Sequence, residues 1–555
     1  MRWGWPLLSL GVALYLSCQG FQNSPPIETR YVGDSVCQQC HAEVSRAYRS
    51  TWKARSLIPI TADLPRMEDF SQPAVYDPWK DFYYRAVWES DSLFLYEYRL
   101  SGKETVYVRR ERLDFVIGSG HQTRSYLLWR NGFLYQAPLT WYEGTRRWGL
   151  SPGYTEGKNS RWSREIQPNC LACHASGWIA VPWTHNRYYR IGGAIGCESC
   201  HGPGSTHVKN PFDTTYFWRR WTPNQQMDAC NRCHLEGIAI ERQGGWEPGK
   251  ALAAHWSVFL PERGELGRFG IASHSERLMR SACYQKGGAT CMTCHHPHPT
   301  SPPPSYNNQC LSCHTRGCQN PRHPSDQCVS CHMPKGESSD VPHTRFTDHY
   351  IRVVRSEAQA PQEAIRLLCA VGCSSDPALL GEAYLKWYVE VKNEPWVLDT
   401  ALRLLAGGER PASYAQALLL KGKPNEALSF AQKALRQDTT LHLLELYGYL
   451  LELTGQTEKA LEVWKRLRAR APAYPDAAFR YVILSYVLGK FSAEETYQSL
   501  QTLVKEQPWN AQFHYNAAVL AAQLGRYSEA KQHLHAALQA DPDYTPAREA
   551  LRRLP

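Results

Sequence analysis

The last third of this 555-residue chain contains no cysteine and very little histidine. All 19 Cys lie at or before Cys373, and most of the 21 His lie upstream of it as well. Residues 374–555 carry only His442, His514, His533 and His535. This absence excludes cysteine-based metal or disulfide chemistry from the C-terminal part, and it predicts a domain boundary near residue 355.

Long apolar runs and biased tracts are also missing. Hydrophobic residues make up 43% of the chain, and no acidic or glycine tract is long enough to indicate wholesale disorder. The N-terminal apolar stretch, residues 6–17, is too short to span a bilayer and fits the core of a signal peptide. Residues 1–18 are therefore predicted to export the protein.

The end of this segment leaves two alternatives open. Leu16-Ser17-Cys18 is similar to the lipobox of bacterial lipoproteins, although Tyr15 occupies a position that is usually Leu. The alternative is a plain secretory peptide with an incidental Cys. We favour lipid anchoring at Cys18, because a leftover Cys beside a cleavage site needs an explanation. In either case we expect the protein in the periplasm, or at the outer membrane or cell surface.

The sequence upstream of Cys373 contains the pattern Cys-x-x-Cys-His seven times. Two thiols at this spacing reach the two vinyl groups of one porphyrin, and the adjacent imidazole then lies beneath the iron. Zinc ribbons, the main alternative, need paired Cys-x-x-Cys units and no following His. The pattern therefore predicts seven covalently bound haem c groups. The motifs are Cys37-Gln-Gln-Cys40-His41, Cys170-Leu-Ala-Cys173-His174, Cys197-Glu-Ser-Cys200-His201, Cys230-Asn-Arg-Cys233-His234, Cys291-Met-Thr-Cys294-His295, Cys310-Leu-Ser-Cys313-His314 and Cys328-Val-Ser-Cys331-His332.

Methionine, the other common axial ligand, is scarce. The chain has six Met including Met1, and Met292 lies inside a motif, whereas many His lie outside the motifs. Bis-histidine ligation is therefore predicted for most of the irons, with mostly low reduction potentials. His207 and His298 are favoured because each closely follows a motif. The full set of distal candidates is His121, His207, His274, His298, His323, His343 and His349.

The first motif, which ends at His41, differs from the others. Lys53 lies at about the distance where multihaem cytochromes often place a distal His. Three completions are open: a deprotonated Lys53, a distant His such as His121, or a five-coordinate iron open to substrate. We favour a distant His. If this haem is catalytic, Lys53 and His41 are the residues that would carry the chemistry.

Four Cys lie outside the motifs. An oxidising compartment favours disulfides, so we predict that Cys283 pairs with Cys318 and braces two haem motifs. Cys369 and Cys373 are a second predicted pair, which needs a non-helical turn between the two residues.

The formal net charge of +10 is compatible with a nucleic-acid or anionic-membrane partner. Two propionates on each of seven haems would add about 14 negative charges, partly offset by the irons. Many of the arginines are therefore interpreted as propionate partners, and no nucleic-acid binding is expected.

Residues 27–355 are predicted to form the haem domain, in which porphyrins supply the apolar area that the chain wraps. Within it, residues 70–165 lack Cys and are rich in aromatic and β-branched residues. Asn131-Gly132 between two such runs is a strong hairpin signal. We predict a small antiparallel sheet with a packed aromatic core; a binding face is the alternative interpretation of the aromatic residues.

Residues 358–555 contain no haem motif and show helical periodicity instead. Gly, Tyr, Ala and Pro recur at tetratricopeptide (TPR) positions, as between Leu524 and Pro542, and Ala427 and Ala460 lie about one repeat apart. The pattern predicts an α-helical solenoid with a concave surface. Such an array docks partner proteins or caps the haem domain; we favour docking of redox partner proteins.

Six further segments have distinctive sequences. They are Gly118-Ser-Gly-His-Gln-Thr-Arg-Ser-Tyr126, Pro138-Leu-Thr-Trp-Tyr142, Ser151-Pro-Gly-Tyr154, Cys200-His-Gly-Pro-Gly-Ser-Thr-His207, Cys331-His-Met-Pro-Lys335 and Asp348-His-Tyr-Ile351. Together they resemble bacterial multihaem c-type cytochromes with C-terminal TPR repeats. The resemblance implies a relation to the hydroxylamine oxidoreductase and nitrite reductase superfamily, and it specifies no substrate. The Cys-x-x-Cys-Lys site of nitrite-reductase-type enzymes is absent, which leaves the octahaem oxidising type open.

The expected fold class is mixed and α-dominated, with a loop-rich, haem-wrapped cytochrome domain, a small antiparallel β insertion and a TPR solenoid. The favoured function is electron transfer in the bacterial cell envelope, and we favour an electron carrier over a substrate-converting enzyme. One alternative is an oxidoreductase that acts on a small nitrogen or sulfur compound at the first haem. Another is an assembly scaffold in which the repeats gather a complex.

Overall fold

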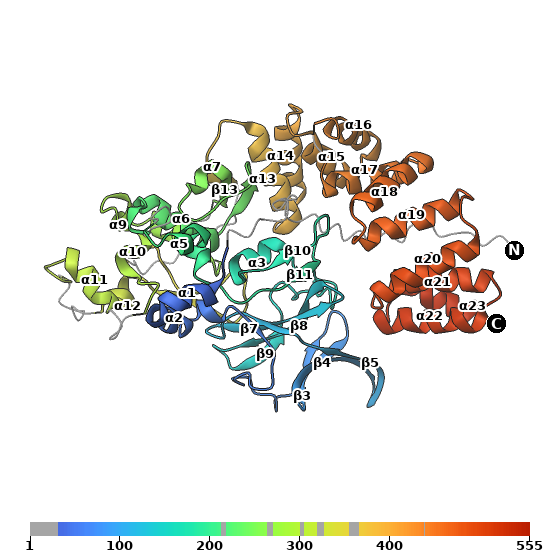
Figure 1. Ribbon diagram of the computed structural model, residues 1–555, viewed down its shortest axis with the longest axis horizontal. Coiled ribbons are helices and arrows are strands. Elements are labelled where there is room, and N and C mark those ends of the chain that lie inside the picture. Colours follow the sequence, from blue (N-terminus) through green and yellow to red (C-terminus); the bar gives the residue numbers. More distant parts are fainter. Residues whose placement is uncertain are drawn as a thin grey trace.

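The computed structural model describes residues 31–212, 218–262, 270–299, 305–318, 327–353, 366–437 and 439–555. The predicted signal segment with Cys18, and the distal candidate His323, lie outside these residues. The described chain is mixed, with many helices and several small antiparallel sheets (Figure 1). Within these ranges, no helix is long and apolar enough to span a bilayer.

Two antiparallel sheets fill the region between the first and second motifs. One has the strand order β2-β3-β4-β5 and the other β1-β6-β7-β8-β9, so the single sheet predicted here is in fact two. The first strand also begins earlier than the predicted residue 70. The strands are β1 (Leu57–Pro59), β2 (Val75–Asp77), β3 (Phe82–Glu89), β4 (Ser92–Ser101), β5 (Glu104–Arg112), β6 (Phe115–Ile117), β7 (Thr123–Arg130), β8 (Phe133–Tyr142) and β9 (Arg147–Leu150).

The hairpin between β7 and β8 is confirmed. Arg130 pairs with Phe133 across the turn, and the two turn residues, Asn131 and Gly132, have φ angles of 50° and 88°. Positive φ at both positions is the geometry of the two-residue turn that matches the twist of the flanking strands.

The aromatic residues of the four-stranded sheet divide between its two faces. Phe82 and Tyr84 are fully buried in a core shared with the five-stranded sheet, as the packed-core interpretation predicts. On the opposite face, the rings of Tyr76, Tyr83 and Tyr98 form a row with centroids 4.6 and 5.3 Å apart. One face is therefore core, and the other presents tyrosines toward solvent.

Short helices and strand pairs form the rest of the haem domain. α6 is the longest of the described helices in this domain. Its start is stabilised by a capping box of Thr222 and Gln225 and by Pro223 in the first turn. The helices are α1 (Asp34–Cys40), α2 (Ala42–Arg49), η1 (Lys53–Arg55), α3 (Pro168–His174), α4 (Glu198–His201), α5 (Ser205–Lys209), η2 (Trp218–Arg220), α6 (Pro223–His234), α7 (Leu252–His255), α8 (His274–Met279), α9 (Ala282–Gln285), α10 (Cys291–Cys294), α11 (Tyr306–Cys313) and α12 (Cys328–His332). The strands are β10 (Ile179–Ala180), β11 (Tyr188–Arg190), β12 (Ile238–Glu241), β13 (Trp256–Pro261), β14 (Lys335–Glu337), β15 (Arg345–Thr347) and β16 (Leu367–Val371).

β16 joins the haem domain although it lies beyond the predicted boundary near residue 355. It pairs antiparallel with β13, and the repeat helices begin only at Pro377. Cys369 and Cys373 form the predicted disulfide at this junction. The predicted Cys283–Cys318 disulfide is wrong: both residues are free thiols, Cys318 is exposed, and Cys283 lies near Cys294 and Cys310 instead.

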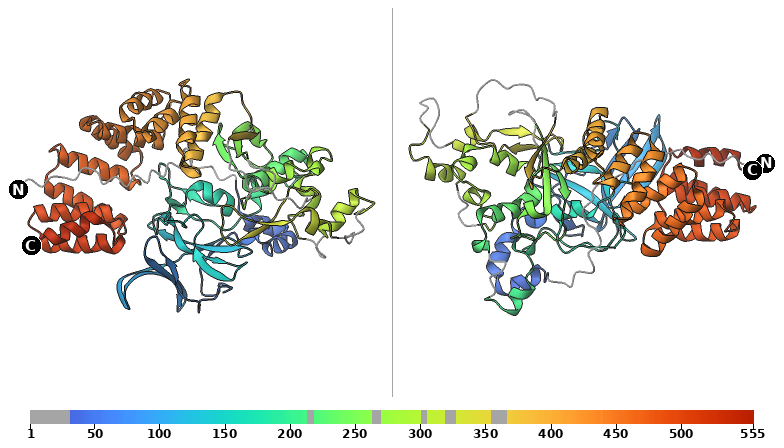
Figure 2. Two further views of the ribbon diagram at one scale, coloured as in Figure 1. Left: turned by 180° about the vertical axis from the view of Figure 1, so that it is seen from behind. Right: turned by 90° about the horizontal axis from the view of Figure 1, so that it is seen from above.

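The C-terminal helices form a curved row of antiparallel pairs along one side of the molecule (Figure 2). Fully buried alanines such as Ala427, Ala460 and Ala530 allow the helices to pack closely, which is the predicted use of the repeated Ala positions. The helices are α13 (Pro377–Glu390), α14 (Pro395–Leu405), α15 (Pro411–Leu420), α16 (Pro424–Ala434), α17 (Leu441–Leu453), α18 (Thr457–Arg470), α19 (Pro475–Val487), α20 (Ala493–Glu506), α21 (Ala511–Gln523), α22 (Tyr527–Ala540) and α23 (Thr545–Arg553).

The ends of successive repeat helices dock on the haem domain. Asn131 donates a hydrogen bond of 2.7 Å to the carbonyl of Glu506 at the end of α20, and Arg109 donates one of 2.8 Å to Ala540 at the end of α22. Arg187 donates to the carbonyl of Ala473, just beyond α18. A helix C-terminus carries partial negative charge and unpaired carbonyls, so these donors stabilise the docked arrangement.

A loop of the haem domain also enters the repeat array. Trp183 packs against the apolar cluster around Leu444 and Tyr474, while His185 Nε2 lies 3.1 Å from both carboxylate oxygens of Glu445 on α17. Tyr474 donates a hydrogen bond to the same carboxylate. Part of the repeat surface is therefore covered by the protein's own chain, which gives the array a structural role in the molecule.

This contact predicts a pH-dependent stability. Burial opposes charge on His185, but Glu445 more than compensates and raises the pKa of His185 to about 9. A raised pKa stabilises the folded state fully below the unfolded value of about 6.5, and the stabilisation is lost as the pH rises through about 9. Glu165 and Asp476 also face His185, and burial raises the pKa of both. Replacing His185 by Gln isolates the contribution of the imidazole. The difference in melting temperature between the wild-type protein and His185→Gln should shrink from pH 6 to pH 10; a constant difference contradicts this assignment.

Candidate haem sites

All seven motifs lie on or at the ends of short helices. Residues three positions apart share one helix face, so the two thiols of each motif lie one above the other and the His follows at the C-terminal end. Thus Cys230 and Cys233 lie in the last turns of α6, which ends at His234. The other motif helices are α1, α3, α4, α10, α11 and α12.

Three motif histidines face a second imidazole across a gap that fits one iron. Metal–nitrogen bonds of about 2 Å on each side place two axial ring centres about 6 Å apart. The observed centroid separations agree with this spacing, and the paired rings are close to parallel. The pairs are His41 with His207 at 6.2 Å, His201 with His298 at 5.8 Å, and His295 with His349 at 6.1 Å.

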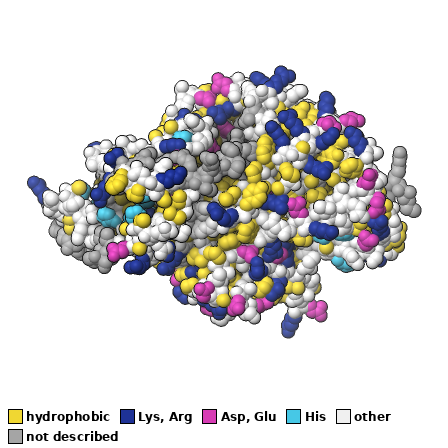
Figure 3. Space-filling model, viewed as in Figure 1, with side chains coloured by type: hydrophobic (Ala, Val, Ile, Leu, Met, Phe, Trp, Pro, Cys, Tyr) yellow, Lys and Arg dark blue, Asp and Glu magenta, His cyan; other side chains and the backbone are white. Residues whose placement is uncertain are grey.

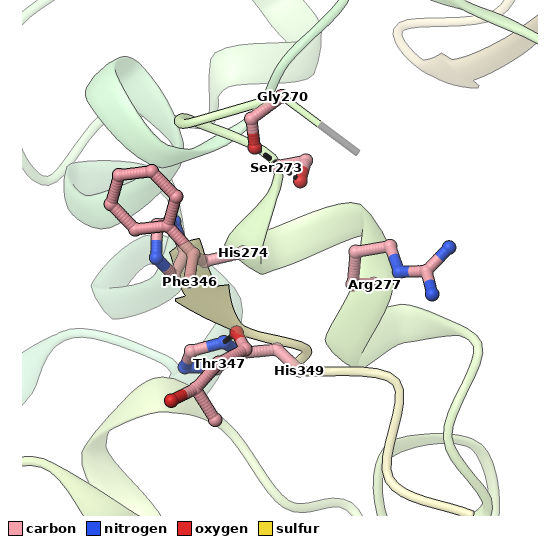
Figure 4. Close-up of a pocket in the computed structure, with 7 residues that line it drawn as sticks. All are labelled: Gly270, Ser273, His274, Arg277, Phe346, Thr347 and His349. Atoms are coloured by element: carbon pink, nitrogen blue, oxygen red, sulfur yellow. Dashed lines mark hydrogen bonds between the residues drawn. The ribbon is translucent and has the colours of Figure 1, made fainter. Parts of the chain in front are cut away.

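A fourth pair is closer and perpendicular. The ring centroids of His234 and His274 lie 5.0 Å apart at an interplanar angle of 86°. His274 also lies against His349, with ring centroids 4.7 Å apart at an interplanar angle of 73°. Figure 4 shows His274 on α8 and His349 beyond β15, both lining one pocket with Phe346.

Burial keeps these imidazoles neutral, which is the form that binds iron. It lowers the pKa of His201, His234 and His295 to about 4 and that of His274 to about 3, with smaller contributions from neighbouring histidines. Burial also lowers the pKa values of His174, His298 and His349. The lowered pKa values favour the neutral form of these imidazoles at neutral pH.

The remaining distal candidates do not face a motif His within the described ranges. The ring of His121 lies against exposed Trp52, with centroids 5.2 Å apart. His343 contacts the edge of Tyr142 at 5.2 Å. His207 and His298 do face motif histidines. His207, which follows the third motif, faces His41 of the first, and His298, which follows the fifth motif, faces His201 of the third.

Lys53 is also placed differently from its sequence interpretation. It lies on η1, where its charge acts on Cys200 of the third motif, His234 of the fourth and Cys291 of the fifth. The side chain therefore lies among the third, fourth and fifth sites. The ring that faces His41 belongs to His207.

Thiols from different motifs lie near enough to shift one another's pKa, and these neighbours indicate the spatial order of the sites. The first site adjoins the third, the second adjoins the fourth, the fourth adjoins the fifth, and the sixth adjoins the seventh. Electrostatic interactions between Cys200 and Cys233, and between Cys294 and Cys310, link the third to the fourth and the fifth to the sixth. The neighbouring thiols of the other four links are Cys37–Cys197, Cys173–Cys233, Cys230–Cys291 and Cys310–Cys328.

The protein around the last three motifs lacks a core of its own. Helices α10, α11 and α12 contain no buried residue. On the face shown in Figure 3, histidine and apolar side chains reach the surface together at the end of the molecule that carries these helices. Covalently attached porphyrins would cover this apolar area, so the residues present fit the haem groups that the motifs predict.

Comparisons with known proteins match two parts of the chain. The family model described as "Cytochrome c554 and c-prime" matches residues 152–202, which contain the second and third motifs. A tetratricopeptide repeat model matches residues 487–554. The chain carries a c-type cytochrome region and TPR repeats. The matched cytochrome family implies covalently bound haem c, and TPR domains commonly mediate protein–protein interaction.

Similar solved structures include YrrB, described as a TPR protein with an unusual peptide-binding site. It is 22% identical, covers 32% of this chain and 92% of its own, and has a TM-score of 0.27. MamA from Desulfovibrio magneticus RS-1 is 18% identical, with coverages of 31% and 99% and a TM-score of 0.26. A search of curated protein sequences found no significant match.

Proposed function

We propose that this protein is a heptahaem c-type cytochrome that transfers electrons in the bacterial cell envelope. The observation that carries the proposal is that thiols of successive sites lie near one another. It supports a continuous row of haems in the order first, third, fourth, fifth, sixth and seventh, with the second attached beside the fourth. Porphyrins attached to neighbouring thiols have short edge separations, which favour electron hopping.

Axial ligation supports the same function. Three irons would be held between two imidazoles at the spacing that one iron needs, which leaves those irons no coordination position for a substrate and favours low reduction potentials. The fourth pair, His234 with His274, lies closer, at 5.0 Å. Histidine pairing at the first haem removes the main support for the alternative, a nitrogen- or sulfur-compound oxidoreductase at His41 and Lys53. The chain's own role at these haems is to orient the imidazoles and exclude water from them.

Export by residues 1–18 and lipid attachment at Cys18 are part of the proposal and place the haem row at a membrane surface. The repeats would dock a redox partner protein. Because the loop containing Trp183 and His185 fills part of the array, we expect the partner on repeat surface that the haem domain leaves uncovered.

The test uses the purified holoprotein. Haem quantification and intact mass should give seven haems per chain, and potentiometric titration should place most of them at low potential. Electron paramagnetic resonance should show mainly low-spin iron, with no spectral change on addition of nitrite or cyanide at the first haem. A stoichiometric high-spin haem that binds nitrite and turns it over would replace electron transfer by the oxidoreductase alternative.

A further inference from the structure

A buried ion triad lies between three of the haem sites. Asp348 accepts two hydrogen bonds from Arg277, at 2.8 and 2.5 Å, and a third from Arg352 at 2.7 Å. The side chains of Arg277 and Asp348 are only 7% and 4% exposed. Such a buried group of charges is sensitive to substitution, because removing one partner leaves the other charges buried without compensation.

The first arm of the triad reaches the fourth haem site. Arg277 follows His274 by three positions on α8, so the two side chains lie on neighbouring parts of the same helix face. The two hydrogen bonds to Asp348 therefore hold α8 against the segment after β15. This fixes the position from which His274 faces His234.

The second arm acts on the fifth haem site through the backbone. Asp348 accepts a hydrogen bond of 2.9 Å from the amide of Tyr350, which fixes the chain on both sides of His349. His349 Nδ1 donates to the carbonyl of Thr347 at 3.0 Å, and the Ser281 hydroxyl donates to the carbonyl of His349. The ring is thereby aimed at His295.

The third arm reaches the seventh haem site. Arg352, held by Asp348, presents its carbonyl to His332 Nδ1 at 3.0 Å. A hydrogen bond from the second ring nitrogen of an axial histidine sets the ring orientation and strengthens the imidazole as a ligand. Asp348 thus joins α8 to its own segment, residues 348–352, and these two segments together contact one histidine at each of three sites, His274, His349 and His332.

We propose that Asp348 is a positioning residue that holds the axial ligands of the fourth, fifth and seventh haems through Arg277 and Arg352. The inference rests on the proposed haem binding. It extends that proposal, because these sites lie in the same half of the proposed row and share one support. A change at the triad therefore alters several potentials along the row together.

The experiment compares two variants of the full holoprotein, each lacking a buried carboxylate. Asp348→Asn should retain seven attached haems, yet convert up to three from low-spin to high-spin or shift their potentials, whereas the first and third haems remain low-spin. Glu97→Gln is the matched control, since Glu97 is fully buried and paired with Arg161 in the four-stranded sheet. It should lower the melting temperature and leave every haem signal unchanged.

Arg352→Gln tests one arm alone. It keeps the Arg277–Asp348 pair, so only the spectrum of the seventh haem should change. This variant tests the inference if Asp348→Asn does not fold. Asp348→Glu should restore part of the wild-type spectrum. Unchanged haem spectra in both Asp348→Asn and Arg352→Gln would overturn the inference, as would equal spectral changes in Glu97→Gln. A wild-type protein with fewer haems than seven would refute the proposed function instead.

Discussion

Replacing Cys230 and Cys233 with Ala is expected to give a six-haem protein in which electrons no longer pass between the two ends of the haem row. The fourth site is the junction of the proposed arrangement, because its thiols lie near Cys173 of the second site, Cys200 of the third and Cys291 of the fifth. Without this haem the first and third haems are separated from the fifth, sixth and seventh. One seventh of the haem absorbance should be lost.

The protein is rapidly and partly reduced, and haem-resolved spectra then record the rate at which electrons equilibrate among the haems. The wild-type protein should equilibrate in a single fast process, whereas the variant should show two populations that exchange slowly. The matched control is Cys170→Ala with Cys173→Ala, which removes the second haem, a side branch. That variant also loses one haem and should keep fast equilibration along the row. Equal rates in all three proteins would contradict the proposed order of sites.

The features that the sequence predicted well depend on short stretches of chain. The turn at Asn131 and Gly132 requires positive φ at two adjacent positions. The TPR pattern is equally local, because each helical pair packs mainly on its neighbour. These features need no knowledge of which distant segments meet.

The axial partners could not be assigned from the sequence because they come from distant segments. His41 faces His207, and His201 faces His298, so each of these distal candidates lies opposite the His of a motif other than the one that it follows in sequence. Lys53 was one of three completions considered for the first haem, on sequence distance alone, and the path of the chain brings it to the third, fourth and fifth sites. Only the tertiary fold decides these assignments.

The arginines show a second limit of composition-based reasoning. They were interpreted mainly as propionate partners, but Arg99 pairs with Asp543 at 2.8 Å, Arg161 with Asp541 at 2.8 Å, and Arg187 with Glu506 at 2.5 Å. Some of the arginines therefore form ion pairs that join the haem domain to the repeats. Net charge does not show which acidic groups lie opposite each arginine; here Asp541 and Asp543 lie in the loop between α22 and α23, and Glu506 ends α20.

Replacing His207 with Gly is expected to convert the first haem from a six-coordinate to a five-coordinate, ligand-binding site. His207 is the imidazole that faces His41, so its loss opens one axial position on one haem of seven. The reduction potential of that haem should rise, because a strong axial donor has been lost. Electron paramagnetic resonance should show one new high-spin signal, and nitrite or cyanide should bind with a stoichiometry of one.

Added imidazole should fill the opened position in His207→Gly and restore the low-spin spectrum, which separates ligand loss from unfolding. His121→Ala is the control, since His121 lies at the surface against Trp52 and was the distant His first considered for this iron. It should leave all seven haems unchanged. If His121→Ala produces the high-spin signal and His207→Gly does not, the first haem is completed by His121 in solution. If the wild-type protein already binds nitrite at this haem, its sixth position is open, and the oxidoreductase function becomes the better account of the protein.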